Sequence, residues 1–412
     1  MHFNKLIIIV FLMVFTACKS NSEYNKTVSI KDDVMFLADD KLQGRQTGTD
    51  GELAAADYIA QRFENIGLST KGPDGYFQTF SFKPKTDPHQ TVNYTVKDGD
   101  STITGTNVIG FIDNKAENTI IIGAHYDHLG YGAEGSLYRG EASEIHNGAD
   151  DNASGVAVML SLAKKLKKKN KGNNYLFIAF SGEEMGLLGS NYFTKKPTIA
   201  LSNANYMINM DMVGRLKENN TLAVYGVGTS PIFKQVVKAN NSKFKIIENE
   251  SGVGPSDHTS FYNSEIPVLH FFTGQHEDYH KPSDDSEKLN YEGMALISTY
   301  IFDIISDLDD NGKMPFRTTK NESEDVPRFK VGLGVIPDYL FDGKGMRIDG
   351  ISEDKPAQKA NLQRGDIVIK LGDSVVTDMM SYMRALSAFD TGDTTKVIVK
   401  RGNDEVEAEI GF

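Results

Sequence analysis

The spacing of apolar and polar positions changes twice along this chain. Between residues 30 and 67, apolar side chains recur at helical intervals. This predicts two helices, the second over residues 50–67 with Asp50 as its cap and Gly67 at its end. Residues 77–106 alternate β-branched and aromatic side chains with polar ones, which is typical of strands. From residue 107 onwards, short apolar runs alternate with longer segments of helical period, which predicts buried strands separated by helices.

The elements beyond residue 107 follow the order expected of a parallel sheet. The predicted strands cover residues 107–113, 119–124, 175–180, 204–210 and 267–272. The predicted helices cover residues 153–166, 185–193, 231–239 and 293–308. Parallel neighbours need a crossover connection, and a helix usually provides it. We therefore predict an α/β fold with three layers, α/β/α, around a mostly parallel sheet.

Polar stretches set the domain boundaries. Residues 19–29 are predicted to be a tether, and a first domain is predicted over residues 30–310. Residues 311–327 are polar and punctuated by proline, which is typical of a linker, and a second, smaller domain is predicted over residues 328–412. Because few contacts usually cross such a linker, we expect the first domain to fold without the second.

The N-terminus predicts a targeting segment over residues 1–18. Lys5 precedes an apolar run over residues 6–15, which is too short to span a bilayer but suits the core of a signal peptide. The run leads to Cys18, the single cysteine of the sequence, and this arrangement resembles a bacterial lipoprotein signal. We expect an exported protein, lipid-anchored in the bacterial cell envelope and facing the periplasm or exterior. An ordinary secretory signal with an incidental cysteine is the alternative.

The composition of the chain limits the classes of partner that the protein can bind. The formal net charge of -12 argues against binding to nucleic acid, because no excess of Lys or Arg is available to neutralise phosphates. With 412 residues and 39% hydrophobic content, the chain can bury a large core. Membrane association is expected through the lipid anchor only.

Candidate metal ligands lie at or just beyond the ends of the predicted strands, or in loops near them. They are His125 with Asp127, Asp150 with Asp151, Glu183 with Glu184, Asp211, and His280. Ligands of open α/β sheets bind at the carboxyl ends of the strands, so these side chains are expected to meet there. Asp127 shares a strand face with His125 and can therefore orient its ring. Of two adjacent carboxylates, one can bind a metal while the other faces a reacting water.

Two histidines and three carboxylates suit a pair of zinc ions, because imidazole nitrogen and carboxylate oxygen are ordinary zinc ligands. Two ions about 3.5–4 Å apart can polarise a carbonyl and activate a water together. Each fragment by itself is also compatible with a structural role. The occurrence of all of them at comparable positions in one domain favours the metal site.

As an ordered set, these motifs resemble those of the co-catalytic zinc aminopeptidases. That family also contains glutamate carboxypeptidases, glutaminyl cyclases and the transferrin receptor ectodomain. The resemblance runs from about residue 33 to residue 306 and rests on His125-Tyr126-Asp127, Gly148-Ala149-Asp150-Asp151-Asn152-Ala153-Ser154-Gly155, Ser181-Gly182-Glu183-Glu184, Asn209-Met210-Asp211 and Tyr279-His280. It implies two Zn²⁺ per chain, with Asp151 bridging them and with His125, Glu184, Asp211 and His280 as the other ligands.

The same resemblance implies roles for further residues. Glu183 would be the general base, and Asp127 would support catalysis beside His125. His258, in the stretch Ser256-Asp257-His258, is a candidate for stabilising the oxyanion. Four other histidines of the first domain are expected to be structural or surface residues: His128, His146, His270 and His276.

Residues 329–412 resemble a PDZ domain of the type associated with bacterial proteases. The motif residues are Val331-Gly332-Leu333-Gly334-Val335, Lys355-Pro356-Ala357-Gln358-Lys359-Ala360-Asn361-Leu362 and Arg364-Gly365-Asp366-Ile367-Val368. The backbone N–H groups of Gly332, Leu333, Gly334 and Val335 would hold the carboxylate of a peptide C-terminus, beside a strand edge that pairs with the peptide. A β-rich domain that merely packs on the peptidase is the alternative.

Three functions remain in view. The first is an exported zinc aminopeptidase that removes N-terminal residues from peptides. The second is a carboxypeptidase or a glutaminyl cyclase-like enzyme on the same scaffold, and the third is a non-catalytic binding protein. The full set of five ligands together with Glu183 argues against the third and leans against the cyclase. The pocket residues that separate aminopeptidase from carboxypeptidase are not identified by the sequence.

Overall fold

The computed structural model of the protein describes residues 28–84, 93–97, 99–169, 171–320, 330–341, 343–352 and 354–412. The predicted signal with Cys18, and most of the predicted tether, lie outside these residues. In the part of the chain that is described, no helix combines the length and the apolar character needed to cross a bilayer.

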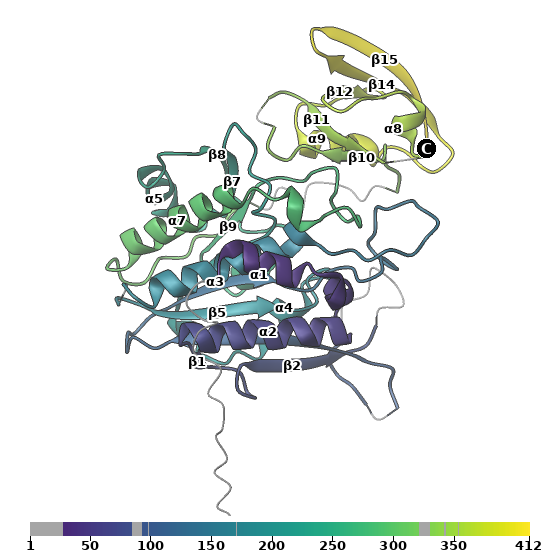
Figure 1. Ribbon diagram of the computed structural model, residues 1–412. Coiled ribbons are helices and arrows are strands. Elements are labelled where there is room, and N and C mark those ends of the chain that lie inside the picture. Colours follow the sequence, from purple (N-terminus) through teal and green to yellow (C-terminus); the bar gives the residue numbers. More distant parts are fainter. Residues whose placement is uncertain are drawn as a thin grey trace, which may run out of the picture.

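A nine-stranded sheet forms the centre of the first domain (Figure 1). Along the sheet the strands lie in the order β1-β3-β5-β4-β6-β9-β7-β8, and β2 pairs with β3. The central strands β5, β4, β6 and β9 are parallel neighbours, whereas β3 and β7 join them antiparallel. The strands are β1 (Ser69–Thr70), β2 (Phe77–Phe82), β3 (Ile103–Ile112), β4 (Thr119–His125), β5 (Asn174–Phe180), β6 (Ala204–Met210), β7 (Thr221–Tyr225), β8 (Lys245–Asn249) and β9 (Val268–Phe272).

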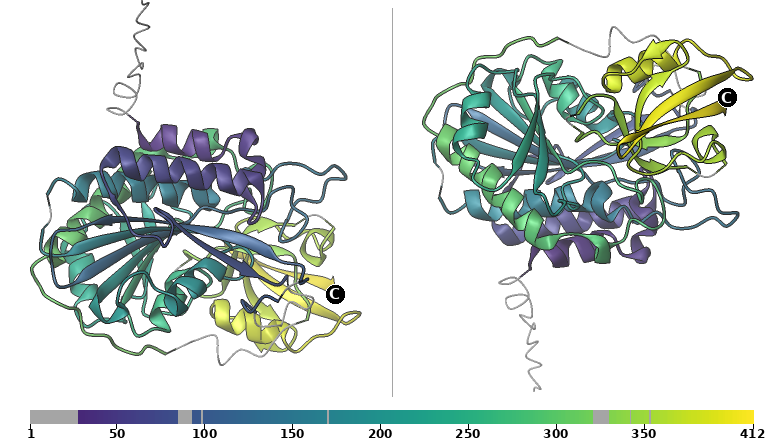
Figure 2. Two further views of the ribbon diagram at one scale, coloured as in Figure 1. Left: turned by 90° about the horizontal axis from the view of Figure 1, so that it is seen from below. Right: turned by 90° about the horizontal axis from the view of Figure 1, so that it is seen from above.

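Helices cover both faces of this sheet, which confirms the three layers predicted from the sequence (Figures 1 and 2). One face packs against α1 (Ile30–Leu37), α2 (Asp50–Ile66), α3 (Gly155–Leu166), α5 (Phe233–Ala239) and α7 (Tyr291–Leu308). The other face packs against α4 (Leu188–Lys195) and α6 (His258–Tyr262).

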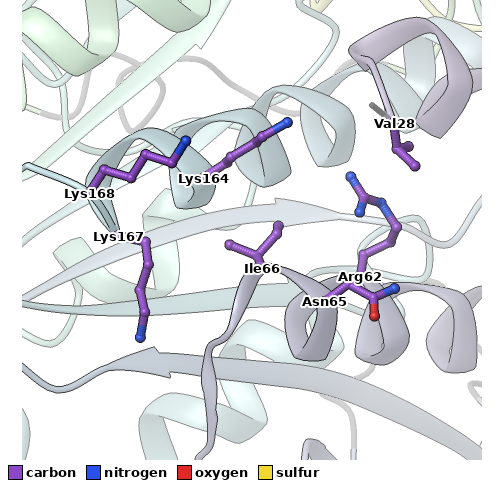
Figure 3. A pocket seen from close by; sticks show the side chains of 7 residues that line it. All are labelled: Val28, Arg62, Asn65, Ile66, Lys164, Lys167 and Lys168. Carbon is purple, nitrogen blue, oxygen red and sulfur yellow. The ribbon is translucent and has the colours of Figure 1, made fainter. Parts of the chain in front are cut away.

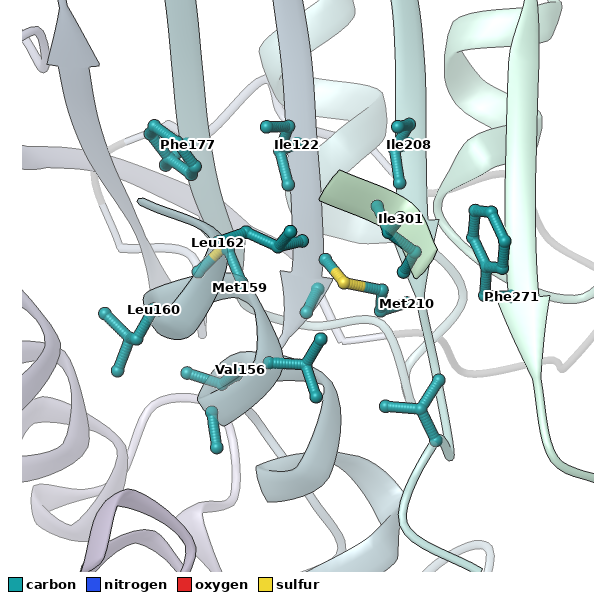
Figure 4. Close-up of a cluster of buried hydrophobic side chains, with 14 of the residues drawn as sticks. Ile122, Val156, Met159, Leu160, Leu162, Phe177, Ile208, Met210, Phe271 and Ile301 are labelled. Atoms are coloured by element: carbon teal, nitrogen blue, oxygen red, sulfur yellow. The ribbon is translucent and has the colours of Figure 1, made fainter. Parts of the chain in front are cut away.

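Side chains of the central strands alternate between the two cores. On β4, Ile120 and Ile122 belong to the core beneath α3 and α7, and Ile121 belongs to the core beneath α4 and α6. Figure 4 shows Ile122 and Phe177, from neighbouring strands, on the same side of the sheet as Leu162 of α3. Full burial of each such side chain stabilises the fold by about 1.5–3 kcal/mol. The strands that carry the candidate ligands are therefore the most firmly anchored part of the domain.

The structure differs from the predicted elements in a few places. Helix α2 begins at Asp50, but its cap is Thr49, whose hydroxyl accepts a hydrogen bond from the N–H of Glu52. Helix α3 begins at Gly155 rather than at residue 153, because Asp151 and Asn152 in the preceding turn have non-helical dihedral angles. Strands β7 and β8 and helix α6 were not predicted at all.

The second domain is a separate antiparallel sheet with its own hydrophobic core. Its strands lie in the order β10-β11-β12-β14-β15, and β13 pairs with β12, so β10 is an edge strand. The elements are β10 (Val335–Pro337), β11 (Met346–Ile351), α8 (Pro356–Lys359), β12 (Ile367–Leu371), β13 (Ser374–Val375), α9 (Met379–Leu386), β14 (Thr394–Arg401) and β15 (Asp404–Gly411).

Residues 311–320, which the sequence assigns to the linker, pack against the first domain. Met314 is buried in the main core, and its N–H donates to Asn205 Oδ1 at 2.7 Å. The N–H of Thr319 donates to Tyr262 Oη at 2.8 Å. This part of the predicted linker therefore belongs structurally to the first domain.

Candidate metal centre

The carboxylate of Asp151 lies between two histidines at the carboxyl ends of the central strands. Its Oδ1 is 3.3 Å from Nε2 of His125, which ends β4. Its Oδ2 is 3.3 Å from Nε2 of His280, in the loop after β9. One oxygen thus faces each imidazole, which is the arrangement that a carboxylate needs in order to bridge two cations.

Each histidine also faces a second carboxylate. Nε2 of His125 lies 3.3 Å from Oδ1 of Asp211, which directly follows β6. Nε2 of His280 lies 3.2 Å from Oε2 of Glu184, which follows β5. The structure therefore brings together all five predicted ligands in two sets that share Asp151.

His128 also lies at this centre, although the sequence analysis treated it as a structural or surface residue. Its side chain is fully buried, and Nδ1 lies 2.7 Å from Oε1 of Glu184 and 4.0 Å from Oδ2 of Asp151. Among the described residues, the donor atoms of His128, Asp151 and Glu184 converge to within 4.8 Å, as do those of His125, Glu183 and Asp211. His128 therefore holds the oxygen of Glu184 that does not face His280. Its place three residues after His125, just beyond the strand, was the signal in the sequence.

Asp127 supports the two adjacent glutamates more directly than it supports His125. Its carboxylate accepts hydrogen bonds from the N–H of Glu183 at 3.1 Å and the N–H of Glu184 at 3.4 Å. The hydroxyl of Thr47 donates to the same carboxylate at 3.1 Å. Nδ1 of His125 is 3.3 Å from the carbonyl oxygen of Asp127 and 3.7 Å from its carboxylate. Asp127 thus fixes the turn that presents both glutamates.

His258, the candidate for stabilising the oxyanion, lies in a buried position beside His270. Its side chain is fully buried and stacks on His270, with the ring centroids 4.4 Å apart. Burial lowers the pKa of His258 well below its ordinary value, so the ring is neutral. The neighbouring Asp257 is the residue of this stretch that the sequence analysis missed. Its carboxylate is fully buried, and burial raises its pKa to about 7.

The two adjacent glutamates differ in their electrostatic surroundings. Burial raises the pKa of Glu183 well above its ordinary value, and the charges of Asp211, Asp257 and Glu184 act in the same direction. Burial also disfavours the charge of Glu184, but His280 and hydrogen bonds from both His128 and His280 lower its pKa to about 2. Glu184 is therefore the permanently charged member of the pair, and Glu183 is the member that holds a proton more readily.

Arg45 braces the loops that carry the ligands. The guanidinium is buried and donates to the carbonyl oxygens of Tyr126 at 2.7 Å, Asn147 at 2.7 Å and Gly148 at 3.0 Å, and also to that of Leu37. Tyr126 follows His125, and Gly148 precedes Asp151 by three residues. One side chain thus ties the end of β4 to the turn before α3. Burial lowers the pKa of Arg45 to about 10, so the side chain stays charged at neutral pH.

Comparison with known proteins gives the family. Residues 107–305 match the model of peptidase family M28, and residues 314–411 match the model of the PDZ domain. The larger domain belongs to peptidase family M28.

Each curated relative is similar to this chain over only part of the relative's own length. The alkaline phosphatase isozyme conversion protein of Escherichia coli (strain K12) is 33% identical over 41% of this chain and 46% of its own length. Aminopeptidase YwaD of Bacillus subtilis (strain 168) is 30% identical over 49% of this chain and 45% of its own. The chain thus spans about half the length of the curated relatives it matches. The M28 domain also shares its fold with the glutaminyl cyclase of Bacteroides thetaiotaomicron, with a TM-score of 0.55 and 19% identity over 68% of this chain and 97% of that one.

A separate cavity of about 150 Å³ lies beside the C-terminal end of α3 (Figure 3). It is lined by Val28, Arg62, Asn65, Ile66, Lys164, Lys167 and Lys168. Helix α3 starts beside the turn of Asp151 and ends at this cavity, and a helix of 12 residues is about 18 Å long. The cavity is therefore not part of the metal centre.

Replacing Arg45 with Met should weaken both the fold and the metal centre. Each buried carbonyl left without a donor costs about 1–3 kcal/mol, so we expect the free energy of unfolding to fall by more than about 3 kcal/mol. Loss of such a supporting contact lowers metal affinity about 10–100-fold. Chelator competition and chemical denaturation measure the two effects. Arg62→Met is the matched control: Arg62 pairs with Asp33 on α1, so only stability should fall. Unchanged zinc affinity in Arg45→Met would refute the bracing role.

His128 and His280 can be separated by their effects on metal. His280→Ala should lower the zinc content of the purified protein, because it removes a ligand. His128→Ala should keep the metal but lower its affinity about 10–100-fold, because it removes the hydrogen bond to Glu184. Elemental analysis and chelator titration distinguish these outcomes. If His128→Ala lost the metal and His280→Ala kept it, the two roles would be reversed.

Proposed function

We propose that this protein is an exported zinc aminopeptidase that removes N-terminal residues from peptides. The observation that carries the proposal is the carboxylate of Asp151, held between His125 and His280 with Glu183 beside them. Membership of the M28 family and the likeness to a curated aminopeptidase support it.

The donor set fits two zinc ions. His125, Asp151 and Asp211 would hold one ion, and Asp151, Glu184 and His280 would hold the other. The nitrogen and oxygen donors are those that zinc prefers, and the surplus of buried carboxylates requires compensating positive charge. Zinc bound here supplies a Lewis acid for the scissile carbonyl and lowers the pKa of water.

Glu183 would move the proton. Its carboxylate accepts a proton from the attacking water and delivers it to the nitrogen of the leaving amine, which is worth about 10²–10⁴-fold in rate. Its raised pKa suits both steps, because a strongly acidic carboxyl would be a poor base. The hydrogen bond from its N–H to Asp127 fixes the backbone from which it works.

Export and the lipid anchor remain part of the proposal. They are supported by Lys5, the apolar run over residues 6–15 and the single cysteine at position 18. The PDZ domain is proposed to bind peptides by their C-terminal carboxylate at Gly332, Leu333, Gly334 and Val335. Gly334 has a φ of 74°, which helps successive N–H groups to point into one concave loop.

A glutaminyl cyclase-like activity is the second candidate, favoured by the fold shared with the Bacteroides thetaiotaomicron enzyme. The two activities differ in their products. We expect aminoacyl-anilides and free peptides to be hydrolysed. N-acetylated and C-terminally blocked peptides show which end is attacked. Peptides with N-terminal glutamine should be shortened rather than cyclised. Chelator should abolish turnover and Zn²⁺ should restore it. Mass spectrometry of the products distinguishes hydrolysis from cyclisation. Cyclisation without hydrolysis would favour the second candidate.

The roles of the two glutamates can be tested by isosteric substitution. Glu183→Gln should lower kcat about 10²–10⁴-fold while zinc content stays near that of the parent, because Glu183 is assigned no ligand role. Glu184→Gln should lower zinc affinity instead, because it removes the charge that faces His280. Loss of zinc in Glu183→Gln with retention in Glu184→Gln would reverse the assignment.

A further inference from the structure

The second domain is docked on the metal-binding loops rather than held by a linker alone. Asp349 of β11 pairs with Lys217 of the loop after β6, with 2.9 Å between Nζ and Oδ2. Arg364 of the second domain donates to Asp349 at 3.1 and 3.2 Å and also binds Glu277 of the loop after β9. The side chain of Asp349 is only 6% exposed, and the two cations outweigh its burial and lower its pKa. The pair of Lys217 with Asp349 is partly buried, whereas Arg364 and Glu277 are both more than half exposed, so the contact of Lys217 with Asp349 contributes more to the docking.

An apolar contact lies beside these ion pairs. Leu340 is buried, and its side chain rests on Gly274, where a Cβ atom would be 2.8 Å from Leu340 Cδ1. Gly274 follows Thr273, whose hydroxyl donates to the carbonyl oxygen of Met212, the residue after the ligand Asp211. Gly274 is also six residues before the ligand His280. The second domain therefore contacts the backbone segment that carries His280. That segment is in turn hydrogen-bonded to the loop that carries Asp211.

The turn that makes this contact is held together by the carboxylate of Asp338. Oδ1 of Asp338 accepts a hydrogen bond from the N–H of Leu340 at 3.0 Å, and its carboxylate also pairs with Arg347. Tyr339, between them, is 41% exposed although it lies next to the first domain. We call residues 338–341 the junction turn.

The junction turn continues the edge strand of the PDZ domain. The carboxylate loop of residues 332–334 precedes β10, and the junction turn follows it. A peptide with its C-terminus at the loop and its backbone along β10 must run antiparallel to β10. Its preceding residues then lead towards the junction turn, and so towards Gly274 and the metal ligands. Partly buried Met379 and Met383 of α9 give this domain apolar side chains that suit an apolar C-terminal residue.

We propose that the PDZ domain holds the C-terminus of a peptide substrate so that its N-terminal part crosses the junction turn at Tyr339 and reaches the metal centre. The substrate class is therefore peptides with a free, apolar C-terminus that are long enough to span both sites. This inference rests on the proposed aminopeptidase function. Short substrates bind at the metal centre alone, whereas long ones gain from two linked contacts.

The test uses a ten-residue peptide with an N-terminal leucine and an apolar C-terminal residue, in free-acid and amidated forms. For the full chain, we expect amidation to lower kcat/KM about 10²-fold, the lower end of the gain that two linked contacts give. Asp349→Asn, which removes the charge between Lys217 and Arg364, should reduce this ratio towards one. Val375→Ala, at an exposed apolar position on β13, is the matched control and should keep the parent ratio. Equal kcat/KM for the two forms in the parent protein would overturn the proposal.

A binding experiment separates this proposal from the proposed activity. In the Glu183→Gln variant, fluorescence anisotropy measures the Kd of the same peptide without turnover. We expect amidation of its tail and acetylation of its head each to raise Kd. If acetylation alone has no effect, the aminopeptidase assignment fails while capture of the tail stands. If amidation has no effect, capture of the tail fails whatever the activity is.

Discussion

The crowding of buried carboxylates at one edge of the sheet is the constraint on which the rest of this structure depends. Asp151, Glu183, Glu184 and Asp211 converge with His125 and His280, and Asp127 and Asp257 lie directly behind them. Burying several like charges costs far more than a fold can supply, unless cations or protons compensate for them. Imidazolium groups can balance part of this charge. Divalent cations bound by these side chains would balance the rest, so metal binding would also stabilise the loops that form the centre.

The surrounding residues hold the carboxylates together through hydrogen bonds to the backbone of the loops that carry them. Arg45 holds the carbonyl groups of Tyr126 and Gly148, and Asp127 holds the N–H groups of Glu183 and Glu184. Asp284 accepts from the N–H of Asp151 at 3.1 Å. The backbone N–H and C=O groups beside these candidate ligands therefore already have hydrogen-bond partners. Such preorganisation lets the carboxylates stay close together without moving apart when their charges repel.

Much of the fold and the centre could be predicted because burial leaves a clear pattern. The runs that became β4, β5, β6 and β9 are apolar on both faces, and their ends carry the ligands. Strand β8 was missed because it is only partly buried and its sequence, KIIEN, carries little periodicity. His128 was missed because a histidine just beyond a strand looks like any loop residue until the chain folds it against Glu184. Asp50 was taken for the cap of α2 because both Thr49 and Asp50 are good capping residues, and only the backbone angles decide between them.

Composition also could not reveal how the two domains meet. A polar, proline-punctuated segment predicts independence, yet residues 311–320 lie on the M28 domain and Asp349, Arg364 and Leu340 dock against its loops. These contacts join residues more than 50 positions apart, so no local pattern records them. Their placement has a physical consequence. Gly274 and Glu277 belong to the segment that carries His280, so any force on the second domain acts on a metal ligand through a short length of backbone. A domain docked at this position contacts the segment that carries His280, which a domain on a free tether does not.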